Sequence, residues 1–141
     1  MELGERVVLV TGGANGIGRA LCRRIRQERP GGIAIADLDL AAAQSVAEEL
    51  GGLAIACDVS RESDVRTAVQ QTIDRFGRLD AVLSNAGITT KGGVETPDAD
   101  WNELWQVNVM AHVYLARAAL PHLLEHEAGA FVVTASAAGL L

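Results

Sequence analysis

The sequence predicts an α/β domain built on a doubly wound parallel sheet. Strand-like and helix-like segments alternate along all 141 residues. The strand-like segments are apolar throughout, which is typical of strands covered by helices on both faces. Short connections between successive β-α-β units favour right-handed crossovers, and these place helices on both sides of the sheet. We read no linker or low-complexity tract in the sequence, so residues 1–141 are expected to form one domain.

Three strand-helix repeats are predicted in the first half of the chain. The strands are expected at Val7–Val10, Ile33–Ala36 and Leu53–Cys57, and the helices that follow them at Ile17–Glu28, Ala41–Leu50 and Arg61–Phe76. Asp39 and Ser60 have the residue types and positions of N-caps for the second and third helices. Gly51 and Gly77 are expected to end these helices.

The second half adds two strands and one long helix. They are expected at Ala81–Leu83, Trp101–Leu124 and Ala130–Thr134. Thr96 and Pro97 resemble the N-cap and first residue of the helix. The sequence stops soon after the last strand, so the sheet is expected to be incomplete at its carboxyl-terminal edge, with apolar surface exposed there. We expect either a fragment of a longer protein or a covering layer supplied from elsewhere.

Composition narrows the classes of partner. With 12 basic and 18 acidic residues, the chain is not expected to bind nucleic acid or an anionic membrane surface. The amino terminus is charged and the apolar run after it is too short for a signal peptide. Cys22 and Cys57 lack metal or disulfide spacing and are expected to be buried thiols of a cytoplasmic protein. His122 and His126 have zinc-like spacing, but we expect an exposed helix end and no metal.

The stretch from Val7 to Gly18, VVLVTGGANGIG, predicts a phosphate-binding turn. An apolar strand stops at Thr11 and enters a loop with glycines at 12, 13, 16 and 18, which runs directly into a helix. Backbone N–H groups at a helix N-terminus suit a pyrophosphate. The strict GxGxxG fingerprint is not met, because Ala14 and Ile17 occupy its third and sixth positions.

Asp37 ends the second strand about twenty residues beyond the glycine loop. A carboxylate there can accept hydrogen bonds from the ribose hydroxyls of a dinucleotide. It would also repel a 2′-phosphate, so Asp37 favours NAD over NADP. Arg19 lies just past the loop and could meet a phosphate, but we interpret it as a solvated charge on the helix. Asp39 is a second acid that could bind the ribose, but its expected role as N-cap of the next helix is sufficient to explain its presence.

The loop, written Thr11-Gly-Gly-Ala-Asn-Gly-Ile-Gly18, resembles the TGxxxGxG signature of the classical short-chain dehydrogenase/reductase family. Ser84-Asn-Ala-Gly87, after the fourth strand, is similar to the NAG motif of that family. The resemblance implies an NAD(P)-binding Rossmann domain over residues 1–141, truncated after the fifth strand. The cofactor-binding residues that the motifs indicate are Gly12, Asn15, Gly16, Ile17, Gly18, Asp37, Asp58, Val59, Asn85, Ala86 and Gly87.

Within this resemblance, Asp58 and Val59 would contact the adenine. Asn15 stands where family members that prefer NADP often place a basic residue, which again indicates NAD. Asn108 interrupts an apolar helical face, and a buried amide needs partners. The resemblance implies that it distorts its helix and holds a water in a proton relay. Ser136 would hydrogen-bond the substrate carbonyl or alcohol oxygen.

The Tyr-x-x-x-Lys acid-base pair of the family does not occur in these 141 residues. The one tyrosine, Tyr114, and the one lysine, Lys91, are far apart in the sequence. His112 is expected at the surface or in a subunit contact. Trp101 and Trp105 share a helical face and are expected to pack against the body or a partner subunit.

The leading hypothesis is an oxidoreductase that transfers hydride between a nicotinamide cofactor, preferably NAD, and a small-molecule secondary alcohol or ketone. The resemblance implies a homodimer or homotetramer with the long helix at an interface. A second hypothesis is a catalytically silent dinucleotide-binding module or scaffold. A third is an enoyl or acyl-carrier reductase, which would use a different tyrosine spacing.

Overall fold

The computed structural model describes residues 3–136. Its strands are β1 (Val7–Thr11), β2 (Gly32–Asp37), β3 (Leu53–Ala56), β4 (Ala81–Ser84) and β5 (Ala130–Val133). Its helices are α1 (Gly16–Gln27), α2 (Leu40–Leu50), α3 (Glu62–Phe76), α4 (Asp98–Trp105) and α5 (Ala111–Leu123). A π-helical segment, η1 (Gln106–Met110), joins α4 to α5. The order of strands and helices is the predicted one, and their ends differ by a few residues.

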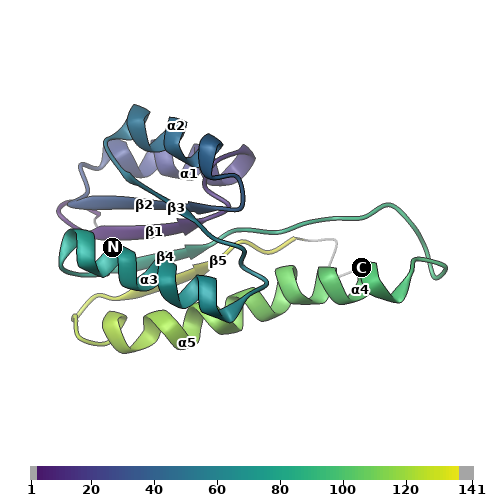
Figure 1. Ribbon diagram of the computed structural model, residues 1–141. Helices are drawn as coiled ribbons and strands as arrows, with labels where there is room; N and C mark the ends of the chain where they lie inside the picture. Colours follow the sequence, from purple (N-terminus) through teal and green to yellow (C-terminus); the bar gives the residue numbers. More distant parts are fainter. Residues whose placement is uncertain (1–2, 137–141) are drawn as a thin grey trace.

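The five strands form one parallel sheet in the order β3-β2-β1-β4-β5. Helices α1 and α2 cover one face, while α3 and α5 cover the other (Figure 1). The strand order reverses between β1 and β4, because the chain crosses to the other side of β1 after β3. This is the predicted doubly wound sheet. Clefts for ligands form at such a reversal, at the carboxyl ends of the strands.

Two hydrophobic cores lie on the two faces of the sheet. Leu9, fully buried on β1, belongs to the core beneath α3 and α5. Its neighbours Val8 and Val10 belong to the core beneath α1 and α2. All five residues of β1 are buried. Coverage of both faces therefore explains why the strand sequence is apolar throughout rather than alternating.

Two of the predicted N-caps are wrong. Arg61, not Ser60, precedes α3, because the Ser60 hydroxyl donates to Asp58 Oδ1 at 2.6 Å instead. At α4, Pro97 is the residue before the helix rather than its first residue, and Thr96 lies outside it. The predicted cap of α2 is confirmed, because the Asp39 side chain accepts the N–H of Ala42 at 3.0 Å.

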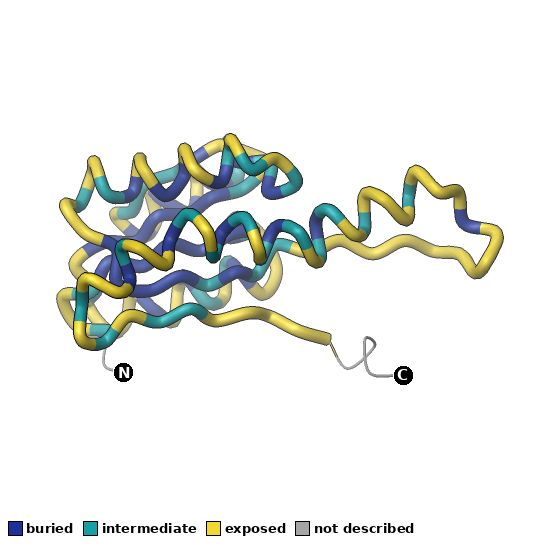
Figure 2. Tube along the Cα trace, turned by 90° about the horizontal axis from the view of Figure 1, so that it is seen from below, coloured by how far each residue is buried: buried dark blue, intermediate teal, exposed yellow. Residues whose placement is uncertain are grey.

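The long helix predicted over Trp101–Leu124 is a series of three helical segments. α4, η1 and α5 follow one another as a rod, and α4 extends beyond the sheet (Figure 1). The loop 88–97, apart from the buried Thr96, and most of α4 are exposed (Figure 2). Trp101 and Trp105 are 54% and 58% exposed. They therefore do not pack against the body of the chain, which was one of the two expected alternatives.

Val132 and Val133 on β5 are 52% and 43% exposed, as expected for an uncovered edge strand. None of the helices within residues 3–136 combines the length and the apolar character needed to span a membrane.

Asp80, a residue that no sequence motif indicates, lies where strands β1 and β4 begin, at the end of the sheet opposite the carboxyl ends of the strands. Its carboxylate is fully buried and accepts the Val7 N–H at 2.8 Å, the Arg78 Nε–H at 2.8 Å and an Arg6 N–H at 3.3 Å. Burial alone would raise the pKa of Asp80, but the bonds from Arg78, Val7 and Arg6 outweigh it and hold that pKa below its usual range. An ionised side chain thus joins the starts of β1 and β4.

Candidate functional site

A cavity of about 510 Å³ lies at the carboxyl ends of the strands. The segments after β1, β2, β3 and β4 contribute to its wall, together with Thr134 after β5 and two residues of the helical rod. Its lining consists of Gly12, Asn15, Gly16, Ile17, Gly18, Asp37, Leu38, Cys57, Asp58, Val59, Ser60, Asn85, Ala86, Gly87, Ile88, Glu103, Val107 and Thr134. Every residue that the sequence predicted to bind cofactor is among them. The fold therefore brings that whole set into one space.

The glycine loop forms a tight turn between β1 and α1. Gly12 and Gly16 have φ values of +63° and +49°, in the region that favours glycine. A Cβ on Gly18 would overlap the carbonyl oxygen of Gly12, so helix and loop touch there. Beside Gly16 the space is open. The first N–H groups of α1 have no acceptor within the helix, and they belong to residues of the cavity wall.

Asn85 ties three strand ends together. Its Nδ2 donates to the carbonyl oxygens of Thr11 at 3.2 Å and Gly12 at 3.3 Å. Its Oδ1 accepts the Thr134 hydroxyl at 3.0 Å. The buried Thr11 hydroxyl oxygen in turn accepts the backbone N–H of Asn85 at 3.0 Å. The sequence did not predict that Thr11 and Thr134 hydrogen-bond Asn85. For Thr11, its position between an apolar strand and the glycine loop could have indicated a role in the site.

Asp37 joins the end of β2 to the glycine loop. Its Oδ2 accepts the Ala14 N–H at 3.0 Å, and its Oδ1 accepts the Asp39 N–H at 3.1 Å. The half-buried side chain thereby holds the loop in place. Its carboxylate oxygens keep further lone pairs, so accepting these two bonds leaves capacity for ligand hydroxyls.

Asp58 builds the turn after β3. Its Oδ1 accepts both the N–H and the hydroxyl of Ser60, at 3.0 and 2.6 Å. Arg61 lies 3.4 Å from the other carboxylate oxygen. Asp58 therefore has a structural role in this turn, in addition to lining the cavity.

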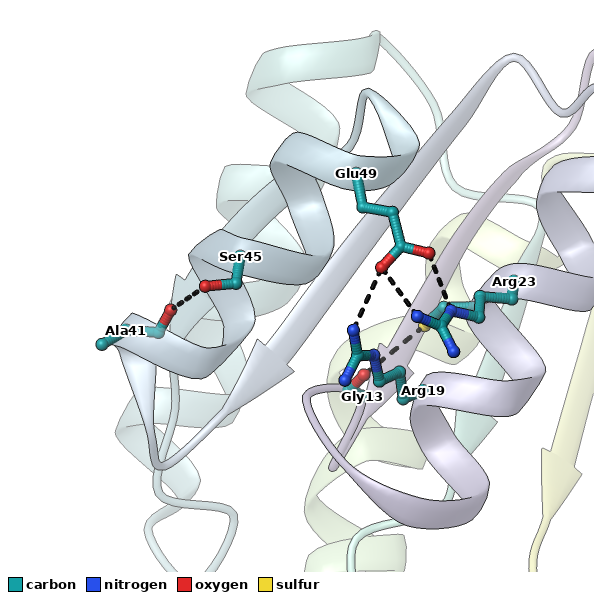
Figure 3. A network of polar contacts seen from close by, with 7 residues as sticks. Gly13, Arg19, Arg23, Ala41, Ser45 and Glu49 are labelled. Atoms are coloured by element: carbon teal, nitrogen blue, oxygen red, sulfur yellow. Dashed lines mark hydrogen bonds and ion pairs between the residues drawn. The ribbon is translucent and has the colours of Figure 1, made fainter.

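Arg19 is not one of the described residues that line the cavity. Its side chain is instead part of a cluster of ion pairs between α1 and α2. Arg19 and Arg23 on α1 both contact Glu49 on α2, at 3.1 and 2.7 Å (Figure 3). Hydrogen bonds from Arg23 and then Arg19 lower the pKa of Glu49 to about 2. Arg19 is thus a surface charge, as predicted, and it is held by an acid of the neighbouring helix.

Asn108 lies in the middle of η1, and this π-helix is the local distortion that the family resemblance implied. Its Oδ1 accepts the Ile88 N–H and its Nδ2 donates to the Ile88 carbonyl, both at 2.9 Å. Asn108 thus holds the backbone of Ile88, the residue that follows Asn85-Ala86-Gly87. Neither Asn108 nor Ser136, an exposed residue beyond β5, is among the described residues of the cavity wall. Their catalytic roles stay predictions.

His112 is half-buried, and its Nδ1 lies 2.5 Å from the hydroxyl oxygen of Ser84 at the end of β4. Burial lowers the pKa of His112. His112 therefore lies partly beneath the surface, because α5 turns this side chain toward the sheet, and the expected alternative of a subunit contact stays a prediction.

Cys22 and Cys57 are free, buried thiols, as predicted. Burial raises the pKa of each to about 12. For Cys57, a residue of the cavity wall, the carboxylates of Asp64, Asp58 and Asp37 add to the effect of burial. Neither thiol has the low pKa of a nucleophile.

Comparisons with known proteins agree with this geometry. The family model described as short chain dehydrogenase matches residues 6–141. L-fucose dehydrogenase of Bos taurus is 41% identical over 130 residues, which are 87% of this chain and 48% of that protein. Meso-2,3-butanediol dehydrogenase of Serratia marcescens is 37% identical over 145 residues, 99% of this chain and 57% of that protein. The chain thus spans about half the length of these relatives.

Two solved structures share the fold. A 3-ketoacyl-(acyl-carrier-protein) reductase from Brucella melitensis, complexed with NADH, has a TM-score of 0.91 and 31% identity over 98% of this chain and 60% of its own. A short chain dehydrogenase/reductase from Burkholderia phymatum, in complex with NAD, has a TM-score of 0.96 and 29% identity over 100% of this chain and 52% of its own. These matches confirm the predicted Rossmann-type sheet.

Proposed function

Because this chain belongs to the short-chain dehydrogenase family, we propose that it binds NAD(H) in the cavity at the strand ends and serves an NAD(P)-dependent oxidoreductase. One observation carries the proposal: the predicted cofactor residues, spread from Gly12 to Gly87, line a single cavity. The presence of NADH and NAD in the two similar structures supports this choice of ligand.

The residues present fit a dinucleotide. The open space beside Gly16 and the first N–H groups of α1 suit a diphosphate. The spare lone pairs of Asp37 suit ribose hydroxyls, and its charge opposes a 2′-phosphate. Arg19, a cation that could have offset this repulsion, is paired with Glu49. NAD is therefore the proposed cofactor, with NADP bound less well.

The proposed substrate is a small secondary alcohol or ketone. Two relatives named for L-fucose and meso-2,3-butanediol, both of which carry secondary hydroxyl groups, support this class. When bound, the nicotinamide supplies the hydride chemistry. We assign to Ser136 a hydrogen bond to the substrate oxygen, and to Asn108 a water of the proton relay. An acid-base group is also needed for the proton.

A catalytically silent dinucleotide-binding module is the second candidate. The one tyrosine, Tyr114, donates its hydroxyl to Gln106 Oε1 at 3.1 Å and stands far from the one lysine in sequence. Both candidates need the cofactor cavity, but only the first needs turnover.

We further propose a homodimer or homotetramer that uses the exposed face of α4, η1 and α5. Trp101 and Trp105 are more than half exposed, and Val109 and Val113, which continue the row at intervals of four, are each 37% exposed. Contiguous exposed apolar rows often mark interfaces. Light scattering after size-exclusion chromatography measures the assembly, and loss of the larger species in Trp105→Glu is the expected result.

The central experiment is calorimetric titration of the folded chain with NADH and with NADPH. We expect saturable NADH binding and NADPH binding that is weaker by about tenfold or more, because Asp37 repels the added phosphate. Absence of NADH binding to a folded sample contradicts the proposal. A spectrophotometric assay of NADH production with a panel of secondary alcohols then separates an enzyme from a silent module.

A further inference from the structure

The charged residues that line the cavity, among those the structure describes, are all acidic: Asp37, Asp58 and Glu103. The first two follow β2 and β3, and the sequence predicted them. Glu103 belongs to α4, and no motif indicated it. A cavity walled by carboxylates favours a ligand with more positive charge over an otherwise similar one with less.

The contacts of the helical segments indicate which end of the cavity holds Glu103: Asn108 of η1, which follows α4, is hydrogen-bonded to Ile88 after β4, and α5 contacts β4 and β5. Asp37 and Asp58 follow the β2-β3 half of the sheet, and the glycine loop follows β1 at its centre. Glu103 lines the cavity together with Gly87 after β4 and Thr134 after β5. A dinucleotide with its adenosine at Asp37 and its diphosphate at the glycine loop therefore extends its second nucleoside toward the end that holds Glu103.

The charge of Glu103 is not neutralised within residues 3–136, because none of the ion pairs there includes it. Glu49 offers the contrast, since two arginines hold its carboxylate (Figure 3). Glu103 thus places an uncompensated negative charge at the wall of the cavity, at the end opposite Asp37.

We propose that Glu103 is a specificity-determining residue that makes the cavity favour NAD⁺ over NADH. The inference rests on the proposed dinucleotide function. The two forms of the cofactor have nearly the same shape, but the nicotinamide ring is positively charged only in NAD⁺. A carboxylate at that end of the cavity attracts the charged ring. Glu103 is exposed, so solvent screens the attraction and the expected effect is modest. Glu103 changes the ratio of the dissociation constants for NAD⁺ and NADH. It does not take part in diphosphate binding by the glycine loop.

The test measures the dissociation constants of NAD⁺ and NADH by calorimetry for the wild-type chain, Glu103→Gln and Glu127→Gln. Glu127 is a matched control, because it is exposed, precedes the amino-terminal end of β5 and is not among the described residues of the cavity wall. We expect Glu103→Gln to lower the preference for NAD⁺ by about threefold or more. Glu127→Gln should leave it unchanged. The effect of Glu103 should also shrink as salt is added.

The outcomes separate this inference from the proposed function. If both cofactor forms bind and the ratio is the same in wild type and Glu103→Gln, the role of Glu103 is overturned while the cofactor cavity stands. If neither form binds the folded wild-type chain, both proposals are overturned. Circular dichroism of each variant establishes that the sample is folded.

Discussion

Asn108 and Ile88 form a closed pair of hydrogen bonds, in which one amide side chain both accepts from and donates to the same peptide residue at 2.9 Å. The pair fastens the segment leaving β4 to the π-helix η1. It uses one acceptor site and one donor of the amide, so one of each is left for another partner. A water in the proposed relay can use this remaining capacity without breaking the contact.

Replacing Asn108 by aspartate should destabilise the chain by about 1–3 kcal/mol at neutral pH. The carboxylate can still accept the Ile88 N–H, but it cannot donate to the Ile88 carbonyl and instead repels it. The pKa of the new carboxyl is therefore expected to rise on folding, so the loss should shrink as the pH is lowered and the group is protonated. Urea unfolding at several pH values measures this, with the exposed Asn102→Asp as control. Equal effects of the two variants would contradict the paired contact.

Asp80 should make stability fall in acid. Its folded pKa is depressed, so its contribution is fully present above the unfolded value of about 4 and is lost as the pH falls through the folded value. Asp80→Asn should cost about 3 kcal/mol at neutral pH, because Arg6 and Arg78 lose their buried acceptor charge. Its unfolding free energy should also depend less on pH than that of the wild type below about pH 4. The exposed Asp74→Asn serves as control, and an acid response identical to wild type in Asp80→Asn would disprove the assignment.

Both thiols should resist modification in the folded chain. Cys22 is 0% exposed and Cys57 is 3% exposed, and each has a pKa raised to about 12. Near neutral pH the reactive thiolate is therefore scarce as well as inaccessible. Titration with a chromogenic disulfide should show almost no reaction until urea unfolds the chain, and then two thiols per molecule. Rapid reaction of one thiol before unfolding would show that the cavity wall at Cys57 is open to reagents.

The type and order of the elements followed from the sequence because they depend on local signals. Apolar runs, capping residues and glycines predicted every strand and the caps at Asp39, Gly51 and Gly77. The Ser60 cap failed because a neighbouring side chain, Asp58, competes for the hydroxyl. Such competition between two polar groups is decided by a geometry that spacing alone does not contain.

The cavity wall was predictable where a motif exists and not where distant segments converge. Asn85 was predicted, but its bond to Thr134 joins residues 49 positions apart. Glu103 reaches the wall only because α4 continues past the sheet. Asp80 matches no sequence motif, because its distant partners Val7 and Arg6 reach it only once β1 lies beside β4. Contacts of this kind depend on strand order, which pattern analysis predicts only in outline.

Asp37→Asn should reduce the discrimination between NADH and NADPH by about tenfold, mainly through weaker NADH binding and reduced repulsion of the 2′-phosphate. Asparagine keeps one acceptor oxygen, so it can retain the Ala14 N–H or the Asp39 N–H as a partner but not both, since Asp37 now accepts them on different oxygens. Urea unfolding of Asp37→Asn therefore measures the loss of loop contact separately from the change in cofactor selectivity. Asp39→Asn is the matched control, because it removes the same charge two residues away and asparagine remains a good N-cap. Calorimetric affinities of the three chains for both cofactors provide the comparison, and a selectivity in Asp37→Asn equal to that of Asp39→Asn would remove Asp37 from ribose recognition.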